Sequence, residues 1–76
     1  MTEEQLAATL AAVITPARLH AELNARRREL GLSQWPWWRV AAELDTATVS
    51  LRWMRDGHVS PALRSRAAAW LERSRE

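Results

Sequence analysis

The sequence predicts an all-α fold, a compact bundle of about five short helices. Alanine and leucine are frequent along the 76 residues, and no segment alternates apolar with polar residues as a strand would. Apolar residues recur instead at helical spacing in five segments, each bounded by residues that begin or end helices. The length allows a single domain over residues 1–76, with a core so small that stability depends on close helix packing or dimerisation.

An additional N-terminal helix is expected over residues 1–14. Thr2 and, three positions later, Gln5 form the capping-box pattern that begins a helix. The apolar stripe of this helix consists of Leu6, Leu10, Val13 and Ile14. Because such a stripe must be covered, we expect the helix either to pack on the rest of the domain or to form a dimer contact.

A second helix is expected from Thr15-Pro16, since threonine caps a helix and proline at the first helical position loses no hydrogen bond. Gly31 is expected to end it as a left-handed cap. Its buried side consists of Leu19, Leu23 and Leu30. Arg26-Arg27-Arg28 near its end is expected to be a solvated face, partly neutralised by Glu22 and Glu29 at helical spacing.

Three shorter helices complete the expected bundle. Pro36 keeps the preceding residue out of α geometry, so the first of them covers 37–44. The next runs from Thr46 or Ala47 to Arg55, before Asp56-Gly57. A closing helix over 60–75 begins at Ser60-Pro61, and its arginines are expected to be mostly solvated. Its core stripe is Leu63, Ala67, Trp70 and Leu71.

The segment 37–57 places two short helices across a tight turn of about three residues. Ala41 is the small residue that allows the helices to cross closely. The corner between them is sealed by Val40, Leu44, Leu51 and Met54. A helix-turn-helix of this shape directs its second helix outward, where it can enter the major groove of DNA.

On these residues the chain resembles the Cro/repressor-like (Xre-type) helix-turn-helix family over roughly residues 16–73. The matching positions are Leu19, Leu30-Gly31-Leu32-Ser33, Val40-Ala41, Leu44, Leu51, Met54, Gly57, Arg64, Ala67 and Trp70-Leu71. The resemblance implies a lambda-repressor-like fold. The chain departs from the family pattern at the turn residues Asp45, Thr46 and Ala47 and in an inserted Gln34-Trp35-Pro36. A turn shifted by one residue would make Thr46 the helix cap.

The outward side of the helix over 47–56 is expected to read DNA bases. A helical-wheel count places Val49, Arg52, Trp53 and Asp56 there, flanked by Thr48 and Arg55. The residues expected to read bases are Thr48, Val49, Arg52 and Trp53. Valine can pack on a thymine methyl group, arginine can hold guanine, and threonine can hydrogen-bond to base or phosphate. Trp53 could lie against sugar and base edges, while Asp56 would repel phosphate unless it pairs with Arg52 or accepts from a cytosine amine. The alternative is that Val49 and Trp53 are buried in a protein interface.

Four further residues are expected to contact DNA phosphates. Trp38 and Arg39 stand at the beginning of the helix over 37–44, an end that favours phosphate. Arg55 and His58 flank Gly57, in a loop where members of the family often contact the backbone. For Trp38 the competing interpretation is a dimer contact or packing against Trp35. Trp37 and Trp70 are expected in the core.

The composition and motifs of the chain argue against several other kinds of function. The chain has no cysteine and only two histidines, too few ligands for a zinc site, and no glycine-rich phosphate loop or activated serine. No apolar run or leader is evident, so we expect a cytoplasmic protein that is not an enzyme, has no metal or cofactor and does not bind membranes. The net charge of +2 combines an acidic N-terminal end with a basic body.

The function expected from sequence is therefore a dimeric regulator that binds double-stranded DNA. The resemblance implies a homodimeric repressor on an inverted-repeat operator, of the phage Cro/repressor, antitoxin or anti-CRISPR-associated type. The alternative is a small helical protein–protein interaction module that uses the Trp38/Trp53 face.

Overall fold

The computed structural model describes Thr2 and residues 14–75. Within this part of the chain the fold consists of four helices and no strand: α2 (Pro16–Leu30), α3 (Trp37–Glu43), α4 (Thr48–Arg55) and α5 (Pro61–Ser74). The expected helix over residues 1–14 falls almost entirely outside the described residues. None of the described helices is long and apolar enough to cross a membrane.

The two long helices begin as the sequence predicts. The Thr15 hydroxyl accepts a hydrogen bond from the Arg18 N–H at 3.2 Å, and the Ser60 hydroxyl accepts one from the Leu63 N–H at 3.2 Å. Each satisfies a backbone donor that the first helical turn leaves without a partner. The next residue in each case is a proline. Gly31, at φ +109°, ends α2 with its N–H donating to the Arg28 carbonyl.

The connection between α3 and α4 decides which of the two expected residues caps α4. Thr46 does not cap α4, because its N–H donates to the Ala41 carbonyl at 2.9 Å and so closes the end of α3. Ala47 is the N-cap, without a side-chain hydrogen bond, and the helix begins at Thr48. Asp45, at φ +52°, is the one non-glycine residue in the described ranges with a left-handed backbone. This geometry is the one that glycine usually supplies and that aspartate tolerates.

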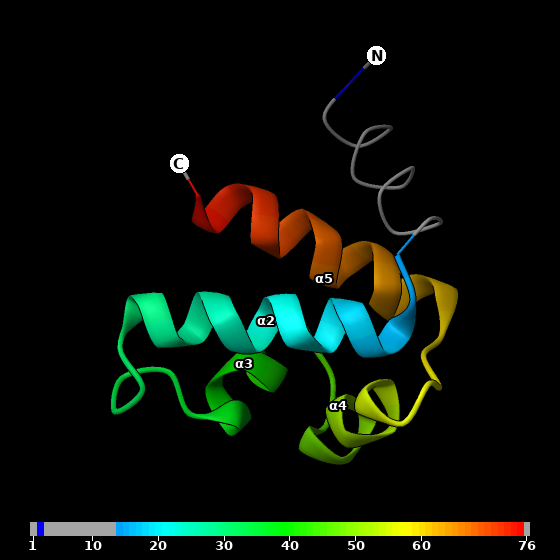
Figure 1. Ribbon diagram of the computed structural model, residues 1–76, viewed down its shortest axis with the longest axis horizontal. Helices are drawn as coiled ribbons and strands as arrows, with labels where there is room; N and C mark the ends of the chain where they lie inside the picture. Colours follow the sequence, from blue (N-terminus) through cyan, green and yellow to red (C-terminus); the bar gives the residue numbers. More distant parts are fainter. Residues whose placement is uncertain (1, 3–13, 76) are drawn as a thin grey trace.

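The core lies where α2 packs against α4 and α5, with α3 packed on α4. Figure 1 shows α2 and α5 side by side and the two short helices on the other side of α2. The largest fully buried side chains are Leu19, Leu23, Val40, Leu44, Leu51 and Met54. Trp70 is also buried, as expected. Trp37 is only half-buried and packs at the edge of the core rather than within it.

Candidate functional site

The exposed side of α4 is the surface that the sequence singled out. Leu51 and Met54 are buried at 1% and 0% exposure and fix the inner side of the helix. The opposite side presents Thr48, Val49, Arg52 and Trp53, all of them exposed. The side chains of Val49 and Trp53 are large apolar groups left 37% and 56% exposed, which is unusual for a helix without a partner.

One edge of this surface, which we call the basic flank, consists of Thr48, Arg52 and Arg55. With His20 and Trp37 these residues line a cleft of about 200 Å³ between α4, α2 and the start of α3. Arg55 Nε lies 3.5 Å from Asp56 Oδ1, so Asp56 pairs with Arg55 and not with Arg52 as one alternative had it. Among the described residues Arg52 has no ion-pair partner.

An aromatic stack supports the basic flank from α2. The Trp37 indole lies on the His20 imidazole with ring centroids 4.6 Å apart and an angle of 20° between the planes. The Arg27 guanidinium lies 4.4 Å from the Trp37 ring centroid. Burial lowers the pKa of His20, and the positive charges of Arg55 and Arg27 lower it further, against a smaller opposing effect of Asp56. His20 is therefore neutral at neutral pH and leaves the positive charge to the arginines.

This stack corrects the expectation that Arg26-Arg27-Arg28 is a solvated face. Arg27 is half-buried, and it also donates to the Asn24 side chain at 3.0 Å and to the Trp35 carbonyl at 3.4 Å. Arg26 is held by Glu29 at 2.7 Å and by the Ser74 hydroxyl at 3.0 Å. The physical reason is that the loop after α2 returns Trp35 and Trp37 to the surface of that helix. Arg28 is the member of the run that is exposed.

The arginines of the closing segment are mostly solvated, as expected, since Arg66, Arg73 and Arg75 are exposed and Arg64 is half-buried. Several of them also have partners within the protein. Arg66 Nε donates to the Leu44 carbonyl at 2.8 Å, and Arg75 pairs with Glu22 and Glu72. Arg64 Nε is buried. Arg73 remains exposed, as expected. Glu22 thus neutralises Arg75 and, at 3.1 Å, Arg18 rather than the arginine run at the end of α2.

At the start of α3, the side chain of Trp38 is exposed, whereas that of Arg39 contacts other residues. Trp38 is 68% exposed. Trp35 packs against Trp70 at 5.5 Å between ring centroids and is covered by the Arg39 guanidinium at 3.9 Å, so it is not the partner of Trp38. Arg39 also donates to the Gln34 carbonyl at 2.7 Å. Arg39 is therefore held close to the protein surface, whereas Trp38 is open to a partner.

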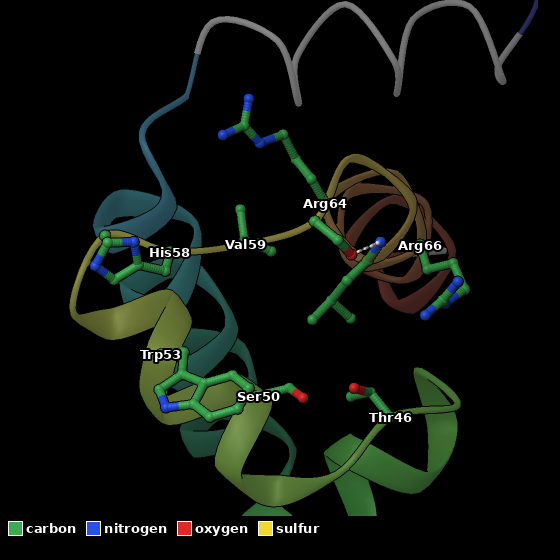
Figure 2. A pocket seen from close by; sticks show the side chains of 10 residues that line it. Thr46, Ser50, Trp53, His58, Val59, Arg64 and Arg66 are labelled. Atoms are coloured by element: carbon green, nitrogen blue, oxygen red, sulfur yellow. Dashed lines mark hydrogen bonds between the residues drawn. The ribbon is translucent and has the colours of Figure 1, made fainter.

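The other edge of the exposed surface, the tryptophan flank, consists of Val49 and Trp53. Trp53 borders a groove between α4 and α5, of about 500 Å³, whose lining includes His58 (Figure 2). The backbone N–H of His58 donates to the Trp53 carbonyl at 2.8 Å, which fixes the loop after α4. Sequence reasoning missed three other lining residues, Thr46, Ser50 and Arg66. Arg66 donates to the Leu44 carbonyl 22 positions away, a contact that no local sequence pattern indicates.

The exposed side of α4 combines positive charge with apolar surface. Exposed guanidinium groups lie along one edge of the helix, and the other edge offers a valine and an indole. A helix of this kind can enter a groove of a nucleic acid, with cations toward phosphates and apolar groups toward bases. Comparison with family models, curated proteins and solved structures found no match for the chain.

Proposed function

We propose that this protein is a sequence-specific DNA-binding transcriptional regulator of the Cro/repressor type. In this proposal α3 and α4 form a helix-turn-helix, and α4 lies in the major groove. The observation that carries it is the exposed row Thr48, Val49, Arg52 and Trp53 on a helix whose opposite side is anchored by buried residues. The major groove is about 12 Å wide and admits a single helix, which must present short and long polar groups together with apolar ones.

Each member of the row has a defined task in this proposal. Arg52, without an ion pair in the described residues, would hold guanine O6 and N7 through two hydrogen bonds. Val49 would contact a thymine methyl group, and Thr48 would hydrogen-bond to a base or a phosphate. Trp53 would cover the sugar and base edges beside them. Discrimination between DNA sequences would then depend on both hydrogen bonding and shape at adjoining base pairs.

Phosphate contacts would flank the reading helix. Arg55 and His58 are exposed at the end of α4, and Trp38 is exposed at the start of α3, where its indole N–H can donate to an oxyanion. Arg39 would contribute positive charge from its fixed position over Trp35. A second copy of the chain would read the other half of an inverted repeat, and occupation of that operator would repress transcription by occlusion.

The decisive experiment is selection of bound sequences from a random DNA pool with the purified chain. Enrichment of an inverted repeat is the result expected for a dimeric regulator. Arg52→Ala should then abolish binding to the enriched sequence while the variant stays folded. The matched control is Arg73→Ala, which removes an exposed arginine from a different hollow, near the end of α5. A folded Arg52→Ala variant with unchanged DNA affinity would refute the proposal.

Salt dependence provides a second test. A dimer with 6–10 phosphate contacts should lose roughly 10³–10⁵-fold in affinity between about 50 and 200 mM salt. An interaction insensitive to salt would instead support the second candidate, a small helical module that binds a protein. The observation favouring that candidate is the exposure of Trp38 and Trp53, at 68% and 56%. Failure to enrich any DNA sequence would also favour it.

A further inference from the structure

The groove between α4 and α5 has the size and lining of a small-molecule site. Its volume of about 500 Å³ falls within the range of about 300–1,000 Å³ that such sites occupy. In Figure 2 the Trp53 ring forms one wall, and the hydroxyls of Ser50 and Thr46 point toward one another across the opening. The buried side chain of Leu63 and the half-buried Val59 supply apolar surface. A flat ring and a polar group could therefore be accommodated together.

The charged residues of the lining, Arg64 and Arg66, are both basic, and no acidic residue lines the groove. Arg66 is the best placed of these, because its Nε is fixed on the Leu44 carbonyl at 2.8 Å, two residues before Thr46. Its two terminal nitrogens can still donate to a ligand. The Arg64 guanidinium lies on the far side of Val59 from Thr46 in Figure 2, so we assign it no direct contact.

We infer that this groove binds a small planar aromatic anion, such as an aromatic carboxylate. The ring lies against the exposed Trp53 indole, where aromatic surfaces pack in offset or tilted arrangements. The carboxylate accepts hydrogen bonds from the Arg66 guanidinium, a charge-assisted pair that can be bidentate. The Thr46 and Ser50 hydroxyls supply neutral donors beside it. Neither a cation nor a neutral apolar molecule would satisfy this set of donors.

A ligand in the groove would regulate DNA binding, a consequence that rests on the proposed function. Trp53 forms a wall of the groove and also belongs to the surface of α4 that would contact DNA. A ligand against the indole occupies the area that sugar and base edges would cover, so ligand and DNA compete. At a ligand concentration ten times its Kd, the apparent DNA affinity falls about tenfold.

The first test titrates 2-naphthoate into the full chain and follows the indole N–H signals of the five tryptophans by NMR. We expect the Trp53 signal to shift with a Kd of about 1 mM, as for a fragment of this size, and the Trp38 signal to stay in place. The neutral isostere 2-naphthamide should bind about tenfold more weakly because it cannot form the charge-assisted pair. Equal shifts of both signals, or equal binding of the two compounds, would overturn the inference.

Matched variants locate the anion. Arg66→Gln should weaken 2-naphthoate binding about tenfold, and Thr46→Val should weaken it by a smaller factor while preserving shape. Arg73→Gln, from the far end of the same helix, is the control and should leave the Kd unchanged. If Arg66→Gln perturbs folding, Thr46→Val alone decides. A Kd that Thr46→Val leaves unchanged, or that Arg73→Gln weakens as much as Arg66→Gln does, contradicts the assignment.

This experiment remains separate from the test of DNA binding. If 2-naphthoate shifts Trp53 but no DNA sequence is enriched, the groove is a binding site and the proposed function fails. If DNA is enriched and 2-naphthoate leaves the Trp53 signal unchanged, the proposed function stands and this inference fails. If both bind without competing, the groove is occupied but the regulatory consequence is wrong.

Discussion

The two flanks of α4 differ in what lies behind them. The basic flank, Thr48, Arg52 and Arg55, is backed by the stack of His20 and Trp37 on α2 and α3. On the tryptophan flank, Val49 and Trp53, the tryptophan borders an open groove toward α5. One edge of α4 therefore has arginine side chains next to stacked aromatic rings. The other edge has an indole next to an open groove.

If α4 binds DNA as proposed, the two flanks would contribute to binding in different ways. Charged groups held near a folded support gain affinity from a partner whose charges are spaced regularly, as phosphates are. An exposed indole beside a groove gains affinity by covering apolar area, about 25 cal/mol for each Å², whatever the charge of the partner. Substitutions that act on one flank and spare the other test whether the two flanks differ in this way.

The largest expected effect comes from removing the anchor that both flanks share. Leu51→Ala should lower the free energy of unfolding by about 2–5 kcal/mol, because it opens a cavity under a side chain only 1% exposed. Val49→Ala, two positions away on the exposed side, should change it by less than about 0.5 kcal/mol. Urea unfolding followed by circular dichroism measures both. Similar losses in the two variants would mean that Val49 is packed against protein.

The next effect separates the flanks by their salt dependence. With an enriched DNA sequence, Arg55→Ala should reduce the slope of log affinity against log salt by about one, since it removes one phosphate contact. Trp53→Ala should weaken binding at every salt concentration and leave the slope unchanged. Affinities measured at several salt concentrations decide between these outcomes. If Trp53→Ala altered the slope as Arg55→Ala does, the two flanks would not be distinct.

A smaller loss of stability is expected when the N-cap of α5, at the border of the groove, is removed. Ser60→Ala should lower the free energy of unfolding by about 1 kcal/mol, because the Leu63 N–H loses the hydroxyl that caps α5. Ser65→Ala, at an exposed position inside the same helix, is the control and should cost nothing. Thermal unfolding of the two variants tests this. Equal melting temperatures would show that the cap contributes nothing.

A substitution in the turn before α4 should slightly raise the stability of the fold. Asp45→Gly should raise the free energy of unfolding by about 0.5 kcal/mol, since glycine adopts φ +52° without a steric cost. Asp45→Ala should lower it by about 1 kcal/mol, because alanine has neither that freedom nor a side chain that bonds locally. Opposite signs in a denaturant titration confirm that backbone conformation limits this position. Gains in both variants would point to the charge of Asp45 instead.

The smallest effect is a pH dependence centred on the support of the basic flank. The folded chain lowers the pKa of His20 below its ordinary value of 6.5, through burial first and then through Arg55 and Arg27. The unfolded chain therefore binds a proton at His20 more readily than the folded chain does. The contribution of neutral His20 to the free energy of unfolding is full above pH 6.5 and is lost as the pH falls toward the folded pKa. His20→Phe keeps a ring against Trp37 and should flatten this part of the stability profile. An unchanged profile would assign the effect to other groups.

Much of the fold follows from patterns that span only a few residues. Thr15 and Ser60 cap their helices through hydrogen bonds to the third residue along, and helical spacing identifies the buried leucines of α2 and α4. The same spacing places Arg52 and Trp53 on the outside of α4. The sequence leaves Thr46 and Ala47 as alternative caps of α4, because two caps one residue apart are equally plausible locally. A backbone bond to Ala41, within the tertiary corner, decides between them.

Local patterns are therefore sufficient for the capped starts of α2 and α5 and for the inner and outer sides of α2 and α4. Which side chains meet across the chain depends instead on tertiary packing. His20 and Arg27 share a face of α2 by their spacing, but the loop that lays Trp37 on them is fixed by packing. Arg66 reaches the Leu44 carbonyl across 22 positions and so helps to form the groove. Local hydrogen bonding and periodicity act over one or two turns, whereas these contacts depend on how the four described helices pack around the core.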